Sequence, residues 1–156
     1  MKTLIIYASH HGCTEKCATQ IHNAFTESTL LPIKRIKTIS VDDFDIVIIG
    51  GSIHAGSLQR SVKKFCENNL NALLSKKVGL FLCSMEQGEK GWQQFDKGFP
   101  EALRNHATAK GLFGGAFDFE RMNFLEKTVV KKVAGVTESV SNISGKAIQD
   151  FIAAMK

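Results

Sequence analysis

The chain has 156 residues, 44% of them hydrophobic, and a formal net charge of +5, which fits one globular domain over residues 1–156. No apolar run is long enough to span a bilayer, and no signal peptide follows Met1, so we expect a cytoplasmic protein. The positive charge is neither concentrated nor interleaved with aromatic residues, which excludes nucleic acid as an expected partner.

The first predicted element is a short apolar strand, Leu4–Ala8, and a helix is predicted over Thr14–Thr26, where apolar residues recur at helical spacing. The loop between them contains Ser9, His10, His11, Gly12, Cys13 and Thr14. Backbone N–H groups at a helix start lack helical partners and carry partial positive charge, so this loop is suited to a phosphate. The alternative interpretation is an ordinary cap in which Ser9 or Thr14 satisfies backbone donors.

Three familiar phosphate-loop types are excluded. The loop lacks the Lys-Ser/Thr ending of NTP-binding loops and the three spaced glycines of dinucleotide-binding loops. Position 19 is Thr, where a Cys-x5-Arg phosphatase loop starting at Cys13 would need Arg. The loop therefore suits a phosphate that is held and not cleaved.

Cysteine usage indicates reduced thiols. The four cysteines are scattered without metal or redox spacing, and Cys13 and Cys17, one helical turn apart, are too few to hold zinc. We therefore expect no metal site, with most thiols buried. The four residues are Cys13, Cys17, Cys66 and Cys83.

The remaining elements alternate between strands and helices. A weaker strand is predicted over Leu31–Ile36, beginning at Pro32 near a sheet edge. The helix over Gly88–Ala107 should be broken near Pro100. The other expected elements are strands at Ile46–Ile49, Val78–Cys83 and Gly111–Phe117 and helices at Leu58–Leu74 and Ser144–Met155.

This alternation predicts an α/β fold: a five-stranded parallel sheet in the order 2-1-3-4-5 with helices on both faces, forming a three-layer sandwich. In such a sheet the ligand site lies at the carboxyl ends of strands one and three. Two further loops leave strands at that edge, so three loops converge on one crevice. The second contains Gly50, Gly51, Ser52, Ile53, His54, Ala55 and Gly56, and the third contains Ser84, Met85, Glu86, Gln87 and Gly88.

These three loops, in this order, resemble those of the flavodoxin-like FMN proteins over nearly the whole chain. The resemblance implies that Ser9–Thr14 bind the FMN 5′-phosphate, that Gly50–Gly56 lie against one flavin face and that Ser84–Trp92 lie along the other. His10 and His11 then contact the phosphate or remain solvated, and His54 stacks on the flavin or points to water. Trp92 covers the flavin or packs within its helix.

Within that group, the sequence is similar to the menaquinone-dependent protoporphyrinogen oxidases of flavodoxin type. The similarity rests on Met1–Ile5, on Val47–Ile53 and on an extra segment at about residues 119–136. It implies an FMN-dependent oxidoreductase acting on a porphyrinogen or quinone, with no catalytic side chain identified and no metal. The alternatives are a soluble electron carrier of flavodoxin type and a binding module without FMN.

The extra segment allows two interpretations. Its apolar residues recur at helical spacing, and its lysines fall largely on the other side. Such a helix either packs on the domain or contacts a membrane surface or quinone.

Overall fold

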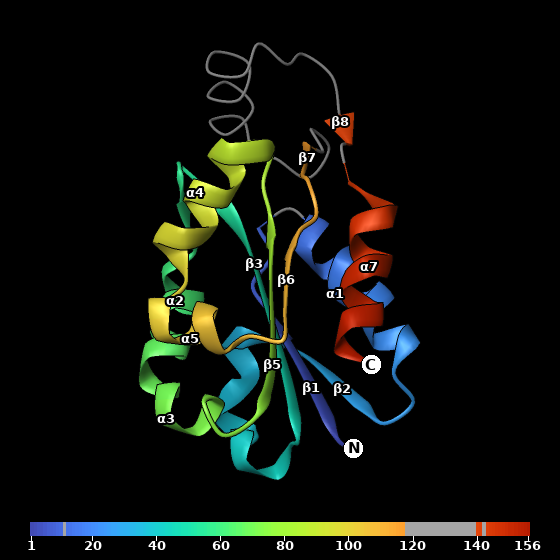
Figure 1. Ribbon diagram of the computed structural model, residues 1–156, viewed down its shortest axis with the longest axis vertical. Coiled ribbons are helices and arrows are strands. Elements are labelled where there is room, and N and C mark those ends of the chain that lie inside the picture. Colours follow the sequence, from blue (N-terminus) through green and yellow to red (C-terminus); the bar gives the residue numbers. More distant parts are fainter. Residues whose placement is uncertain (11, 118–139, 142) are drawn as a thin grey trace.

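The computed structural model describes residues 1–10, 12–117, 140–141 and 143–156 (Figure 1). The sheet has the order β2-β1-β3-β5-β6 with parallel neighbours, and β4 pairs antiparallel with β3. This order confirms the predicted 2-1-3-4-5 arrangement. The strands of this sheet are β1 (Thr3–Tyr7), β2 (Ser28–Pro32), β3 (Ile46–His54), β4 (Ser57–Leu58), β5 (Lys77–Cys83) and β6 (Ala109–Leu112).

Helices cover both faces of the sheet, and each face has its own apolar core. On one face lie α1 (Cys13–Ala24) and α7 (Gly145–Met155), and on the other lie α2 (Arg60–Asn68), α3 (Leu70–Leu73), α4 (Gly88–Gly98) and α5 (Glu101–His106) (Figure 1). Alternate residues of β1 enter different cores: Leu4 and Ile6 one, Ile5 and Tyr7 the other. Successive side chains of a strand point to opposite faces of the sheet, and both faces are buried here. Such a strand is therefore continuously apolar.

The second strand lies earlier than predicted. It ends at Pro32, opposite Tyr7 of β1, and a 3₁₀ helix follows at Ile33–Thr38. Proline has no N–H group to extend the ladder, so Pro32 ends the strand, and the prediction that it begins there is wrong. The predicted edge position is confirmed, because β2 is the outer strand beside β1.

The predicted helix over Leu58–Leu74 is divided. Leu58 belongs to β4, and α2 ends at Asn68. The side chain of Asn69 donates a hydrogen bond to the Phe65 carbonyl at 2.9 Å, and its backbone leaves the helical region at φ −113°, ψ 15°. A side chain that bonds a carbonyl within its own helix competes with the helical pattern, so α3 begins separately at Leu70.

The strand predicted over Gly111–Phe117 is also divided. Strand β6 ends at Leu112, Gly114 has a φ of 85°, and β7 (Ala116–Phe117) pairs with β8 (Val140–Ser141) in a separate small sheet. Glycine adopts positive φ readily, so the chain turns away from the main sheet there. The predicted break at Pro100 is confirmed, since α4 ends at Gly98 and α5 begins at Glu101.

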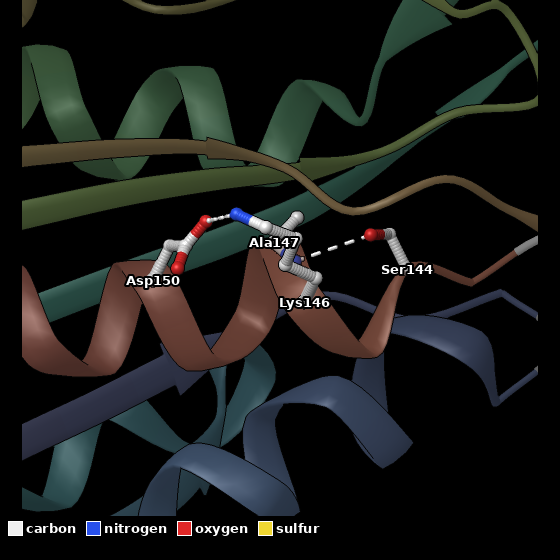
Figure 2. A network of polar contacts seen from close by, with 4 residues as sticks. All are labelled: Ser144, Lys146, Ala147 and Asp150. Carbon is white, nitrogen blue, oxygen red and sulfur yellow. Dashed lines mark hydrogen bonds and ion pairs between the residues drawn. The ribbon is translucent and has the colours of Figure 1, made fainter.

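The last helix, α7, matches its prediction. The Ser144 hydroxyl caps it by accepting the Ala147 N–H group at 3.1 Å, and Lys146 pairs with Asp150 one turn on at 2.7 Å (Figure 2). The extra segment predicted at residues 119–136 lies outside the described residues. Among the helices of the described part, none is long and apolar enough to cross a membrane.

Candidate cofactor site

The loop after β1 is shaped as an anion-binding helix start. Gly12 precedes α1 with a φ of 89°, and its N–H group donates to the Ser9 hydroxyl at 2.9 Å. The first helical hydrogen bond runs from the Lys16 N–H group to the Gly12 carbonyl. The N–H groups of Thr14 and Glu15 therefore precede the first hydrogen bond of the helix. They form part of the positive end of the helix dipole. His11, predicted here as a phosphate residue, lies outside the described residues.

Thr14 carries an unusual buried hydroxyl. The residue is 1% exposed, and in the described part of the chain its Oγ1 atom has no hydrogen-bond partner. Buried polar atoms are nearly always paired, and an exception calls for an explanation such as a ligand. Of the two residues in the capping interpretation, Ser9 does satisfy a backbone donor, the Gly12 N–H group, whereas the Thr14 hydroxyl satisfies none among the described residues.

The predicted second loop, Gly50–Gly56, is mostly strand. Strand β3 continues to His54, and only Ala55 and Gly56 form the turn into β4. Their φ values of 52° and 83° are those of a type I′ hairpin turn, which requires positive φ at both central residues. A Cβ atom on Gly51 would lie 2.5 Å from Leu58 Cδ1, so the missing side chain of Gly51 makes room for Leu58, and a contact between the Gly51 backbone and the flavin stays a prediction.

Gln59 joins the first loop to this hairpin. Its side-chain oxygen accepts the Ser52 N–H group at 2.7 Å, and its side-chain nitrogen donates to the Ser52 hydroxyl at 2.7 Å and to the Ala8 carbonyl at 3.2 Å. Gln59 is not among the residues that the sequence pattern indicates. Its position directly after the hairpin is the one signal that would have indicated it.

Two of the predicted site histidines lie together. The ring centroids of His10, from the first loop, and His54, at the hairpin tip, are 4.0 Å apart and tilted by 44°. Both residues are exposed. The contact brings the ends of β1 and β3 to one place, as the sheet order requires.

The third loop is held by Ser84, which is 4% exposed. The Ser84 hydroxyl donates to Gln94 Oε1 of α4 and accepts the Glu86 N–H group at 3.1 Å. The Ser84 N–H group donates to the Gly114 carbonyl at 2.8 Å, so the loop is tied to the chain after β6. Met85 is half-buried, and Glu86, Gln87 and Gly88 are exposed.

Trp92 stands on α4 and is 39% exposed. The centroid of its ring lies 5.2 Å from the ring centroid of Phe95 on the same helix, and the two rings meet edge to face. This contact favours the helix-packing interpretation, and a position over the flavin stays a prediction.

A cleft of about 820 Å³ adjoins the first loop. It lies between the 3₁₀ helix after β2 and helix α2, and Tyr7, Ser9, His10 and Glu15 contribute to its lining. Burial raises the pKa of Tyr7, and the nearby Glu15 carboxylate raises it further. No pattern in the sequence indicates this cleft, because its cationic lining comes from two separate elements: Lys34, Arg35 and Lys64.

The predicted state of the cysteines is confirmed, because all four are free thiols and Cys17, Cys66 and Cys83 are buried. The sulfur atoms of Cys13, Cys17 and Cys83 all lie within 4.8 Å of one another, although Cys83 is far away in the sequence. Three thiols that are scattered along the sequence therefore form one cluster in the fold. Cys66 is buried in the other core.

Comparison with known proteins agrees with this architecture. A family model described as a flavodoxin domain matches residues 4–144. No curated protein matches the sequence significantly. One similar solved structure is a flavodoxin from the domain Archaea, with 15% identity over 99% of this chain and 94% of that chain and a TM-score of 0.59. Another is the flavodoxin of Streptococcus pneumoniae TIGR4, with 14% identity over 99% of this chain and 95% of that chain and a TM-score of 0.60. A third is a flavoprotein in complex with FMN from Lactobacillus acidophilus NCFM, with 18% identity over 73% of this chain and 91% of that chain and a TM-score of 0.50.

Proposed function

Because the chain belongs to the flavodoxin domain family, we propose that it is an FMN-binding redox protein whose cofactor lies at the carboxyl ends of β1, β3 and β5. The observation that carries this proposal is the buried Thr14 hydroxyl without a partner among the described residues. It lies at the start of α1, where a phosphate would receive hydrogen bonds from both side chain and backbone. The FMN complex of the Lactobacillus flavoprotein, which shares the fold, supports the choice of ligand.

The proposed contacts follow the three loops. The phosphate would be held by the loop from Ser9 to Thr14, and the flavin ring by the hairpin residues Ser52–Gly56 and by Ser84–Gly88. FMN supplies electron or hydride transfer when bound, while the protein supplies binding, orientation and local charge. The hydrogen bonds of Gln59 and Ser84 fix the backbones of the second and third loops before the ligand arrives, which lowers the entropic cost of binding.

The test compares FMN with riboflavin, which lacks the phosphate. We expect the protein to quench FMN fluorescence with a defined endpoint and to bind riboflavin much more weakly. Equal affinity for the two flavins would contradict the phosphate site. Absence of binding to either would contradict the whole proposal and favour a binding module without FMN.

For the reaction, we propose an oxidoreductase acting on a large apolar substrate that carries carboxylates, with a porphyrinogen as donor and a quinone as acceptor. Support comes from the cleft beside the first loop, where Lys34, Arg35 and Lys64 contribute positive charge. A net charge of +5 also favours the approach of an anionic substrate. The proposed membrane contact of residues 119–136 would bring the protein to a quinone, and sedimentation with anionic liposomes tests it.

Turnover of protoporphyrinogen with a menaquinone analogue tests this reaction. The double variant Lys34→Gln/Arg35→Gln should raise KM with little change in kcat, because these side chains lie in the cleft and are expected to attract the substrate. Lys37→Gln is the matched control, since Lys37 is exposed on the same 3₁₀ helix but does not line the cleft. An identical effect of both changes would contradict a role for the cleft.

The competing function is a soluble electron carrier, which fits the flavodoxin family equally well. A carrier would accept electrons in two separate one-electron steps, whereas the proposed enzyme would be reduced in one two-electron step. Potentiometric titration of the FMN-loaded protein separates these outcomes. Two well-separated one-electron reduction steps, together with no porphyrinogen turnover, would contradict the oxidoreductase proposal and favour the electron carrier.

A further inference from the structure

Three thiols meet directly beneath the loop after β1. Cys13 is the first residue of α1, Cys17 lies one turn further on the same helix, and Cys83 ends β5. Their sulfur atoms all lie within 4.8 Å of one another, and those of Cys17 and Cys83 are 3.7 Å apart. Cys17 and Cys83 are 0% and 3% exposed, and Cys13 is half-buried.

This spacing matches a single metal ion bound by three sulfurs. With metal–sulfur bonds of about 2.3 Å, sulfurs arranged in a plane around one ion lie about 4.0 Å apart. We propose that Cys13, Cys17 and Cys83 bind one Cu(I) ion. Soft thiolate ligands select Cu(I), whereas zinc requires a fourth ligand, and the described residues place no other His, Cys, Asp or Glu in this cluster.

The surroundings fit a thiolate complex. Cys13 is the first residue of α1, where the helix dipole stabilises negative charge on a thiolate. Half-buried Cys13 gives the ion an entry path, while the two buried sulfurs exclude water from the other side.

Binding exchanges protons for the metal and needs no electron transfer. Each thiol that becomes a ligand releases its proton to solvent as its bond to the ion forms. Copper enters and remains as Cu(I). Because protons compete with the ion for the thiolates, acidification should release it.

The test is an anaerobic titration of the reduced protein, as purified, with Cu(I) in competition with bicinchoninate. We expect one ion per chain. Loss of even an outer partner of a metal ligand costs about 10–100-fold in affinity, so Cys17→Ala and Cys83→Ala should each cost more than that. Cys66→Ala is the matched control, because Cys66 is equally buried but belongs to the core on the opposite face, and it should retain the ion.

Cys13→Ser guards against misfolding as an explanation, because this half-buried position tolerates a small polar residue better than the core positions do. Its thermal unfolding should match the wild type without copper, and the stabilisation that Cu(I) gives the wild type should be lost. Failure of the wild type to retain Cu(I), or equal retention by Cys13→Ser, would overturn the proposal. Neither outcome depends on flavin binding, so the cofactor proposal stands or falls separately.

Discussion

Gln59 holds Ser52 by two hydrogen bonds of 2.7 Å each, one to its N–H group and one to its hydroxyl. The same side chain donates to the Ala8 carbonyl at 3.2 Å. One half-buried amide therefore sets the distance between the loop that begins after β1 and the hairpin that ends β3. These are the two segments proposed to contact different parts of one cofactor.

Replacing Gln59 with Leu should weaken both stability and FMN binding. The change leaves the N–H group and hydroxyl of half-buried Ser52 without their partner, so the cost should lie near the lower end of the about 1–3 kcal/mol that an unsatisfied buried polar group carries. Urea unfolding and FMN titration measure the two effects. Gln93→Leu, on the exposed side of α4, is the control and should change neither. FMN affinity at the wild-type value in Gln59→Leu would show that the bridge does not organise the site.

Thr14→Val should have opposite effects on the ligand-free and ligand-bound protein. Valine keeps the branched shape and removes a buried hydroxyl that lacks a partner among the described residues, so the free energy of unfolding without flavin should rise by about 1 kcal/mol. FMN affinity should fall about tenfold or more, because hydrogen bonds to charged groups contribute about 1.5–3 kcal/mol.

The control for Thr14 is Thr19→Val. Thr19 is exposed on the same helix, and its hydroxyl donates to the Glu15 carbonyl at 2.8 Å. This change should leave FMN affinity unaltered. A Thr14→Val protein that is less stable without flavin would show that the hydroxyl has a structural partner.

Ala55→Gly should stabilise the hairpin. Ala55 has a φ of 52°, and a left-handed conformation costs an L-residue about 1–2 kcal/mol that glycine does not incur. After the entropic disadvantage of glycine, about 0.5–1 kcal/mol, the midpoint of urea unfolding should rise slightly. Ala153→Gly in α7 is the control, and it should destabilise by up to about 1 kcal/mol. Destabilisation by both changes would contradict the assigned turn.

Stability should decline in alkali because of Cys66. Burial raises the pKa of this thiol from 9.0 to about 12, with a smaller contribution from Glu67. Between these values the unfolded chain loses the proton while the folded chain keeps it, so stability is full below about pH 9 and falls as pH rises. One such group contributes a slope of up to about 1.4 kcal/mol per pH unit.

Urea unfolding of the wild type and Cys66→Ala between pH 8 and 11 measures this slope. The free energy of unfolding of Cys66→Ala should fall less steeply with pH than that of the wild type. The smaller side chain lowers stability by the same amount at every pH and so does not change this slope. Parallel curves for the two proteins would contradict the raised pKa.

The sequence predicted the parts of the fold that depend on local pattern. Continuous apolar runs located β1, β3 and β5, because strands covered on both faces bury every residue. Pro100 correctly indicated the break between α4 and α5. Pro32 was misread, since a proline that cannot continue a ladder ends one strand as readily as it begins another.

The parts of the site that sequence reasoning missed depend on contacts between distant residues. Cys83 joins Cys13 and Cys17 only because β5 ends beside the start of α1, and no spacing in the chain indicates that. The same holds for the cleft, where Lys64 of α2 joins Lys34 and Arg35, which lie 30 and 29 positions earlier in the chain. The hydrogen bond from Gln59 to Ala8 likewise spans 51 positions.

The two-sided sheet has a consequence for how the chain emerges from the ribosome. The face that carries Ile5, Ile48 and Phe81 is completed by α7, whose residues Ile148 and Phe151 are buried against it. Until Gly145–Met155 have been synthesised, a nascent chain presents this aromatic face to the cell. Such surfaces attract chaperones and promote aggregation. The opposite face is complete much earlier, because its four helices all precede β6 (Figure 1).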